Sequence, residues 1–148
     1  MKRLMVFVFL LAALAISSGV QAQQAADFDN HIVHYNALIT NLISLQMAQA
    51  YGIQRSSNRA LLTITVMEKG EDSFGVPIHA TVKANGKNLT GQRRKIPMRE
   101  VSDLQGAVYY LGELPVHNLE IYDFTVDIKV EGEDESLTVS FRKQFYTE

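Results

Sequence analysis

Tyr122-Asp123-Phe124-Thr125-Val126-Asp127-Ile128-Lys129-Val130 is the stretch of sequence that decides the fold of this chain. Aromatic or branched apolar side chains occupy every even position, and polar side chains occupy every odd position. Because successive side chains of a β-strand point to opposite faces, this period of two predicts a half-buried strand. Its apolar row must meet a second sheet that faces it.

The segment that follows predicts the partner of this strand. Apolar residues stand at positions 137, 139, 141 and 145 and alternate with polar ones, and Gly132-Glu133-Asp134-Glu135 separates the two runs. Two alternating runs with a short polar connection predict an antiparallel hairpin. The acidic connection is interpreted as a solvated hairpin tip, since a calcium loop needs a fuller set of spaced oxygen ligands.

Further strands are predicted towards the N-terminus. Residues 32–39, 59–68 and 107–114 are rich in β-branched or aromatic residues, and the last two are apolar enough to be central strands. Residues 78–84 alternate between apolar and polar. Asn85-Gly86 favours a type I′ turn, although the residues after it are too polar to be an obvious partner strand.

Arg93-Arg94-Lys95-Ile96-Pro97-Met98-Arg99 combines two apolar residues on one face with four cations and a proline. Proline cannot donate to a hydrogen-bond ladder, and charges deter pairing between edges, so this segment is predicted to lie at a sheet edge. The cations are interpreted first as protection of that edge, with a binding patch as the alternative.

One stretch breaks the β pattern. Ser44 is an N-cap type residue, good helix formers follow it, and Gly52 stands just past the end, which predicts a short helix near residues 44–51. Leu45, Ala48 and Tyr51 have helical spacing and are expected to cover an open end of the core.

Together these segments predict an all-β fold. About seven strands with turns between them indicate an antiparallel two-sheet sandwich, immunoglobulin-like in the broad sense, with one short helix. A closed barrel is the main alternative.

The N-terminus predicts export. Two basic residues precede an apolar run, Leu4 to Ile16, and small residues follow at Val20 and Ala22. The run is shorter than the roughly 20 residues that cross a bilayer, and the pattern is typical of a secretory signal peptide cut after Ala22. Removing 22 of the 148 residues leaves 126, a suitable length for one β-sandwich domain over residues 23–148.

Composition excludes several classes of site and partner. The chain has no cysteine, which excludes a lipid-modified N-terminal cysteine, a cysteine-ligated zinc, a blue-copper thiolate and a thiol nucleophile. Without the two basic residues of the signal, the 14 Lys and Arg fall to 12 against 16 Asp and Glu, a net charge of −4. This balance argues against nucleic acid as a partner, and no second apolar run predicts insertion into a membrane.

Recognised catalytic patterns are missing from the sequence: it contains no Gly-x-Ser-x-Gly, no phosphate-binding glycine loop and no His-Glu-x-x-His. His31 and His34 are three residues apart on a predicted strand and therefore point to opposite faces. A copper or zinc site that uses them or His79 is an alternative without a His- or Met-rich tract to support it. No catalytic residue, metal ligand or cofactor is assigned.

The candidate binding residues are Arg55, Asn58 and Arg59, which lie in a polar loop that leads into a predicted central strand. Arginine forks bind carboxylates and phosphates through two parallel hydrogen bonds, so this loop could hold an anionic ligand or partner. The alternative is structural: the arginines pair with acids such as Glu113 or Glu120, or donate to loop carbonyls.

Several short segments carry a family resemblance: His34-Tyr35-Asn36-Ala37, Ala50-Tyr51-Gly52-Ile53, Arg55-Ser56 with Asn58-Arg59-Ala60, Asn88-Leu89-Thr90-Gly91-Gln92, Tyr109-Tyr110, and Glu131-Gly132-Glu133-Asp134 with Leu137-Thr138-Val139. In this order they resemble the small exported proteobacterial proteins catalogued as domain of unknown function 4426. The resemblance covers nearly all of the chain after Ala22. It implies a Gram-negative source and a periplasmic location, and it brings no activity, cofactor or catalytic residue.

The leading functional hypothesis is a non-enzymatic periplasmic binding or accessory module that recognises a protein or a small anionic partner. Recognition is expected through the loop from Arg55 to Arg59 or through an exposed strand edge. The alternative from another class is periplasmic handling of copper or zinc. A hydrolase or lyase is the third hypothesis, and it requires a pocket with a shifted acid or base.

Overall fold

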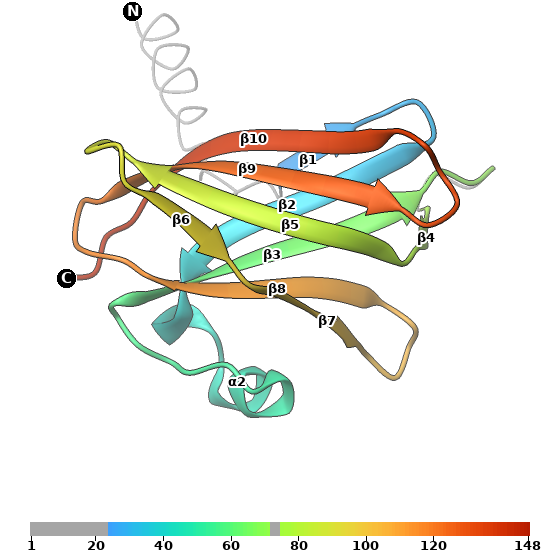
Figure 1. The fold of residues 1–148 in the computed structure, drawn as a ribbon. Helices are drawn as coiled ribbons and strands as arrows, with labels where there is room; N and C mark the ends of the chain where they lie inside the picture. Colours follow the sequence, from blue (N-terminus) through green and yellow to red (C-terminus); the bar gives the residue numbers. More distant parts are fainter. Residues whose placement is uncertain (1–23, 72–74) are drawn as a thin grey trace, which may run out of the picture.

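The computed structural model describes residues 24–71 and 75–148, so the predicted export signal, Met1 to Ala22, lies outside the described residues. Within them, ten strands, a 3-10 turn and one α-helix follow one another along the chain (Figure 1). In chain order these are β1 Gln24–Asp27, β2 His31–Ile39, η2 Thr40–Leu42, α2 Leu45–Tyr51, β3 Arg59–Glu68, β4 Val76–Pro77, β5 Ala80–Asn88, β6 Arg93–Ile96, β7 Met98–Ser102, β8 Val108–Pro115, β9 Ile121–Val130 and β10 Ser136–Gln144.

The strands form two antiparallel sheets. The first sheet has the order β1-β2-β3-β8-β7, with β4 beside β3, and the second has the order β10-β9-β5-β6. This architecture confirms the all-β two-sheet prediction and the central positions of β3 and β8. The number of strands in the described residues is ten rather than about seven, because β1 and β4 are short additions and the segment 93–99 forms two strands.

The core lies between the two sheets, as the alternating pattern predicts. All five even-numbered residues from Tyr122 to Val130 are buried on β9, and Phe124 is 1% exposed. β9 pairs with β10 over the whole of the predicted hairpin, with Phe124 opposite Phe141. Buried residues of β2, β3 and β8 face this row from the first sheet. The immunoglobulin-like classification stays a prediction.

The predicted turn at Asn85-Gly86 is wrong. Both residues lie inside β5, where Gly86 pairs with Arg94 of β6, and the connection to β6 falls later, at residues 89–92. The glycine serves packing rather than a turn: a Cβ atom built on Gly86 would lie 3.0 Å from Cδ1 of Tyr122. The absence of a side chain therefore makes room for the Tyr122 ring in the core.

The predicted edge segment is confirmed at the edge of both sheets. β6 is the last strand of the second sheet and β7 is the last strand of the first. Pro97 stands between them, at the point where the chain crosses from one sheet to the other. Ile96 is 2% exposed and reaches the core. The basic cluster is thus divided between two sheets.

The predicted helix is confirmed together with both of its caps. The Ser44 hydroxyl accepts a hydrogen bond from the Met47 backbone N–H at 3.2 Å. Gly52 ends the helix with a φ of 62°, in the left-handed region where glycine avoids the steric cost of a Cβ.

The predicted location of the helix is wrong. α2 packs on the outer face of the first sheet and not on an open end of the core, and Leu45 is 59% exposed. The cause is Leu61 and Leu111, which point outwards from β3 and β8 and need cover. With α2 and its flanking residues they form a second apolar cluster: Ile43, Ala48, Ile53, Leu61 and Leu111.

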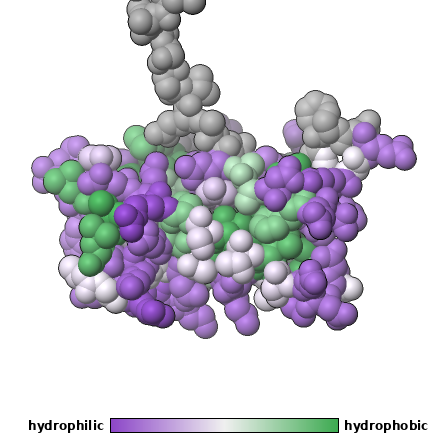
Figure 2. Space-filling model, turned by 90° about the horizontal axis from the view of Figure 1, so that it is seen from above, coloured by the Kyte–Doolittle hydropathy of each residue, from purple (hydrophilic) through white to green (hydrophobic). Residues whose placement is uncertain are grey.

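β1 and β10 form the edge of the sandwich that lies opposite the edge formed by β7 and β6. Half-buried apolar side chains pack against the core there: Ala26, Phe28, Tyr35, Leu137 and Phe141. The view from above shows apolar surface framed by polar side chains (Figure 2). Among the described residues, no helix is both long and apolar enough to span a membrane.

A partly buried polar cluster joins the β5–β6 turn to the β8–β9 connection. Asn88, 8% exposed, donates to Glu120 Oε1 at 3.1 Å, and the His117 backbone N–H donates to Glu120 Oε2 at 2.9 Å. Burial raises the pKa of the Glu120 carboxyl, but the hydrogen bonds from Asn88 and His117 outweigh burial, and the pKa is lowered overall. The ionised form therefore stabilises the fold.

This lowered pKa predicts an acid-sensitive contribution to stability. A carboxyl with a lowered folded-state pKa contributes stability above its unfolded value, and that contribution is lost as the pH falls through the folded value. We expect Glu120→Gln to be less stable than the wild type at pH 7, with the difference shrinking once the pH falls below about 4.5. Urea unfolding of both proteins at several pH values measures this; the exposed Glu131→Gln is the matched control. A difference that stays constant with pH would contradict the assignment.

Candidate functional site

The loop that contains the predicted binding residues is held against β2 by a buried threonine. Thr40, 0% exposed, donates to the Gln54 carbonyl at 2.8 Å and accepts from the Ser56 backbone N–H at 2.9 Å. A hydroxyl that bonds to two backbone groups of the loop fixes its path. The residues that follow lead directly into β3.

The predicted binding residues have partners within the chain. Arg55 donates to the Asn41 carbonyl at 2.9 Å, and Arg59 Nη1 lies 3.7 Å from Glu113 Oε2. The Asn58 carbonyl accepts from the Val116 backbone N–H at 3.0 Å. These are the structural contacts named as the alternative for the arginines, a loop carbonyl and Glu113. A binding role for Arg55, Asn58 and Arg59 stays a prediction.

The three histidines proposed as metal ligands lie in separate environments. His31 is buried, with Nε2 3.3 Å from Glu133 Oε1, whereas His34 lies on the other face of β2 with its enclosed Nδ1 unpaired among the described residues. His79 Nδ1 lies 3.0 Å from Glu100 Oε1. Within residues 24–71 and 75–148, no group of three or more His, Cys, Asp and Glu could hold a metal ion.

His79 and Glu100 belong to a polar chain at the start of β5. The Tyr110 hydroxyl donates to Glu100 Oε2 at 2.9 Å and accepts from the Ala80 backbone N–H at 2.7 Å. Burial, followed by the hydrogen bond to Glu100, raises the pKa of Tyr110 to about 12. A tyrosine with this pKa stays protonated at neutral pH, so the chain ties β7, β8 and β5 together.

The cations of the predicted edge segment point to different parts of the molecule. Arg93 and Lys95 lie on the outer face of the second sheet, whereas Arg94 reaches the Tyr122 hydroxyl on the inner side. Arg99, on β7 of the first sheet, donates to the Tyr51 carbonyl at the end of α2. Only two of the four cations can therefore act at one surface.

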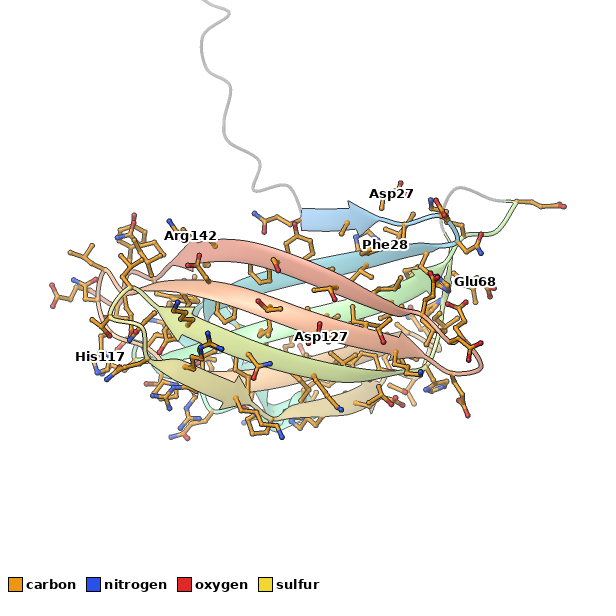
Figure 3. All side chains as sticks on the ribbon, turned by 45° about the horizontal axis from the view of Figure 1, so that its top comes forward. Asp27, Phe28, Glu68, His117, Asp127 and Arg142 are labelled. Carbon is orange, nitrogen blue, oxygen red and sulfur yellow. The ribbon has the colours of Figure 1, made fainter. Side chains whose placement is uncertain are left out.

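Two lysines of β5 join Arg93 and Lys95 on this surface. Lys87 is the direct cross-strand partner of Arg93, and Lys83 lies on the same face of β5. We call Lys83, Lys87, Arg93 and Lys95 the basic face. Figure 3 looks onto the outer face of this sheet, where Asp127 is labelled on β9 and Arg142 on β10.

A concavity lies within the basic face. Its volume is about 390 Å³, and its walls combine two cations with neutral donors and one acid. The lining residues are Asn85, Gly86, Lys87, Arg93, Asp123 and Thr125. Gly86 lines the concavity with backbone atoms, since its missing side chain would point into the core against Tyr122.

Both acids of the neighbouring strand are engaged by β10. Arg142 donates to Asp123 through Nε at 2.6 Å and Nη2 at 2.8 Å, and Thr138 donates to Asp127 at 2.9 Å. The hydrogen bonds from Arg142 lower the pKa of Asp123, which therefore stays ionised and paired at neutral pH. The charge of Lys87 also lowers the pKa of Asp123, but four cations beside two acids leave the basic face with a surplus of positive charge.

Asp123 and Asp127 are the cross-strand neighbours of Lys87 and Lys83, but neither acid forms an ion pair with a cation of the basic face. Among residues 24–71 and 75–148, the ion pairs engage Arg59, Lys69, Arg142 and three histidines, and none involves Lys83, Lys87, Arg93 or Lys95. In a chain with a net charge of −2, four cations together on one exposed face attract anions. The strand alternation places Lys83 and Lys87 on one face, but only the pairing of β5 with β6 adds Arg93 and Lys95.

Comparisons with known proteins agree on one family. A family model described as "Domain of unknown function (DUF4426)" matches residues 25–148. The crystal structure of a DUF4426 family protein from Pseudomonas aeruginosa is similar to this chain, with 31% sequence identity and a TM-score of 0.72. The similarity covers 86% of this chain and 97% of that one. No curated protein matches this chain.

Proposed function

This chain belongs to the DUF4426 family, and we propose that it is a non-enzymatic periplasmic binding module whose basic face recognises an anionic ligand. The observation that carries the proposal is a concavity lined by Lys87 and Arg93, on a face with two further lysines, where hydrogen bonds from β10 engage both nearby acids. A phosphate, sulfate or carboxylate group is the chemistry that such a surface takes. Protein or small-molecule ligands that present these groups are both compatible.

The residues of the basic face suit a phosphate better than an isolated carboxylate. Arg93 offers a planar fork of donors, and the cross-strand Lys87 offers a mobile ammonium beside it. Asn85 and Thr125 line the same concavity and can add neutral hydrogen bonds to further oxygens. A ligand with several oxygens can engage all four side chains at once.

A periplasmic location is part of the proposal. The basic start, short apolar run and small residues before position 23 support export. The similarity to a protein of Pseudomonas aeruginosa, a Gram-negative bacterium, supports the periplasm as the destination. Fractionation of cells that express the full chain, together with N-terminal sequencing of the exported form, tests this location.

The binding prediction is tested with sodium tripolyphosphate titrated into the mature protein by calorimetry. We expect saturable binding that weakens as salt rises, since exposed charges are screened. Lys87→Gln/Arg93→Gln should weaken it about tenfold, because two charge-assisted contacts are lost. The matched control, Lys129→Gln/Lys143→Gln, removes the same charge away from the concavity and should change affinity less than about twofold.

Two outcomes would argue against the basic face as the binding site. Equal weakening by both double variants would mean attraction by net charge alone and would reject the concavity as a site. Loss of binding in Arg55→Ala/Arg59→Ala, with Lys87→Gln/Arg93→Gln unchanged, would instead support the loop predicted from the sequence.

A further inference from the structure

A groove lies on the other sheet, between α2 and the outer face of β3 and β8. Its volume is about 220 Å³, and aromatic or aliphatic side chains form most of its wall. The lining residues are Met47, Tyr51, Ile53, Leu61, Thr63, Tyr109 and Leu111. Met47 is 52% exposed, so the groove opens to solvent beside the helix.

The two tyrosines give the groove one rigid aromatic end. Tyr51 and Tyr109 meet edge to face, with ring centroids 6.4 Å apart and an interplanar angle of 63°. Leu61 and Leu111 form the floor and are each 5% exposed. An apolar cavity of roughly 150 Å³ holds a benzene molecule, so this groove has room for one ring or a short alkyl chain.

A cation stands at the rim of the groove. Arg99 is the cross-strand partner of Leu111 and donates to the carbonyl of Tyr51. It forms no ion pair with a carboxylate of residues 24–71 or 75–148. Its remaining guanidinium N–H groups are therefore available to an anion at the mouth of the groove.

The other charged groups near the groove are already engaged. Arg59 lies two residues before Leu61 on the same face of β3 and pairs with Glu113 at 3.7 Å. Asp103, which acts on Tyr109 from the β7–β8 turn, accepts from the backbone N–H groups of Gln105 and Ala107. Arg99 is therefore the charged group that makes the mouth of the groove prefer an anion to a cation.

We propose that this groove binds the apolar body of a small amphipathic carboxylate and that Arg99 binds its carboxylate group. The apolar walls and the volume select an alkyl chain or single ring, and the rim charge selects an anion over a cation. This site is separate from the basic face, which lies on the second sheet, and it does not depend on the function proposed for that face.

Octanoate, octylamine and octanol test the charge preference with the same apolar body. The mature protein is labelled at its methionine methyl groups, and the Met47 signal is followed by NMR during each titration. We expect octanoate to bind saturably and octylamine to bind about tenfold more weakly. Arg99→Gln should remove this difference while octanol binds as it does to the wild type.

Two further variants test whether the ligands bind in the groove and whether this site is independent of the basic face. Thr63→Leu fills the groove and should weaken all three ligands, whereas Lys87→Gln/Arg93→Gln should leave octanoate binding unchanged. Equal affinity of the wild type for octanoate and octylamine would overturn the role of Arg99. A Met47 signal that does not move at millimolar octanoate would overturn the site itself.

Discussion

Phe124→Ala is expected to lower the free energy of unfolding by about 3–5 kcal/mol, the usual cost of removing a phenyl ring from a packed core. Phe124 is 1% exposed and stacks with Phe141 at a centroid distance of 5.0 Å. It also meets Phe145 edge to face, at 6.2 Å and 89°. Its removal leaves a cavity against both rings. Phe141 is held on β10, and Phe145, just after β10, is held by a hydrogen bond from its backbone N–H to the Glu120 carbonyl, so neither ring can move in to fill the space.

Comparing variants on the two faces of β9 shows whether the loss of stability comes from core packing or from strand propensity. Phe124→Leu retains most of the apolar volume and should cost less than about 2 kcal/mol. Thr125→Ala, on the solvent face of the same strand, should cost about 1 kcal/mol or less. Urea unfolding followed by circular dichroism measures all three. If the Thr125 and Phe124 alanine variants lost equal stability, β9 would not present its aromatic row to the core.

A structural feature of this chain can be predicted from the sequence when neighbouring residues alone determine it. Alternation along β9 and β10 depends on neighbouring residues alone, so the hairpin and its buried face could be predicted. The caps of α2 are also local: Ser44 and Gly52 act within one turn of the helix. Its location is not local, because the need to cover Leu61 depends on which face of β3 the second sheet occupies.

Gly86 shows why local signals can mislead. An Asn-Gly pair is favourable in a tight turn, yet the same glycine can serve a strand by leaving space for a ring that lies far away in the sequence. Here the ring belongs to Tyr122, which is on the neighbouring strand β9. The choice between turn and strand is therefore settled by packing that the dipeptide does not contain.

The composition of the basic face depends on which residues of β5 and β6 pair with each other. Arg93 and Lys95 were recognisable as part of a basic segment, but their convergence with Lys87 requires the pairing of β5 with β6. The separation of Arg99 from them requires the crossover at Pro97. Binding residues that come from paired strands can be inferred only once the pairing is known, whereas a single loop such as 55–59 is visible in the sequence by itself.

Gly112→Val is expected to lower the free energy of unfolding by about 3 kcal/mol or more, because it overpacks the point where the chain changes sheets. A Cβ atom built on Gly112 would lie 2.4 Å from Met98 Sδ and 2.7 Å from Ile96 Cγ2, and Pro97 O would be 3.2 Å away. The Met98 thioether can turn aside, but Ile96 is buried and the Pro97 carbonyl belongs to the backbone. Gly112 is not among the glycines with positive φ, so the cost is steric.

A double-mutant cycle tests this steric origin. Gly112→Ala alone should cost about 1–3 kcal/mol, and Met98→Ala should recover part of that loss because it vacates the nearest contact, giving a coupling of about 1 kcal/mol. Additive losses would show that Gly112 is required for another reason.

The crossover beside Gly112 also places Arg93 and Arg99 on different sheets. Gly112→Ala should therefore weaken both tripolyphosphate and octanoate binding, whereas Phe124→Leu, which leaves the crossover intact, should affect neither.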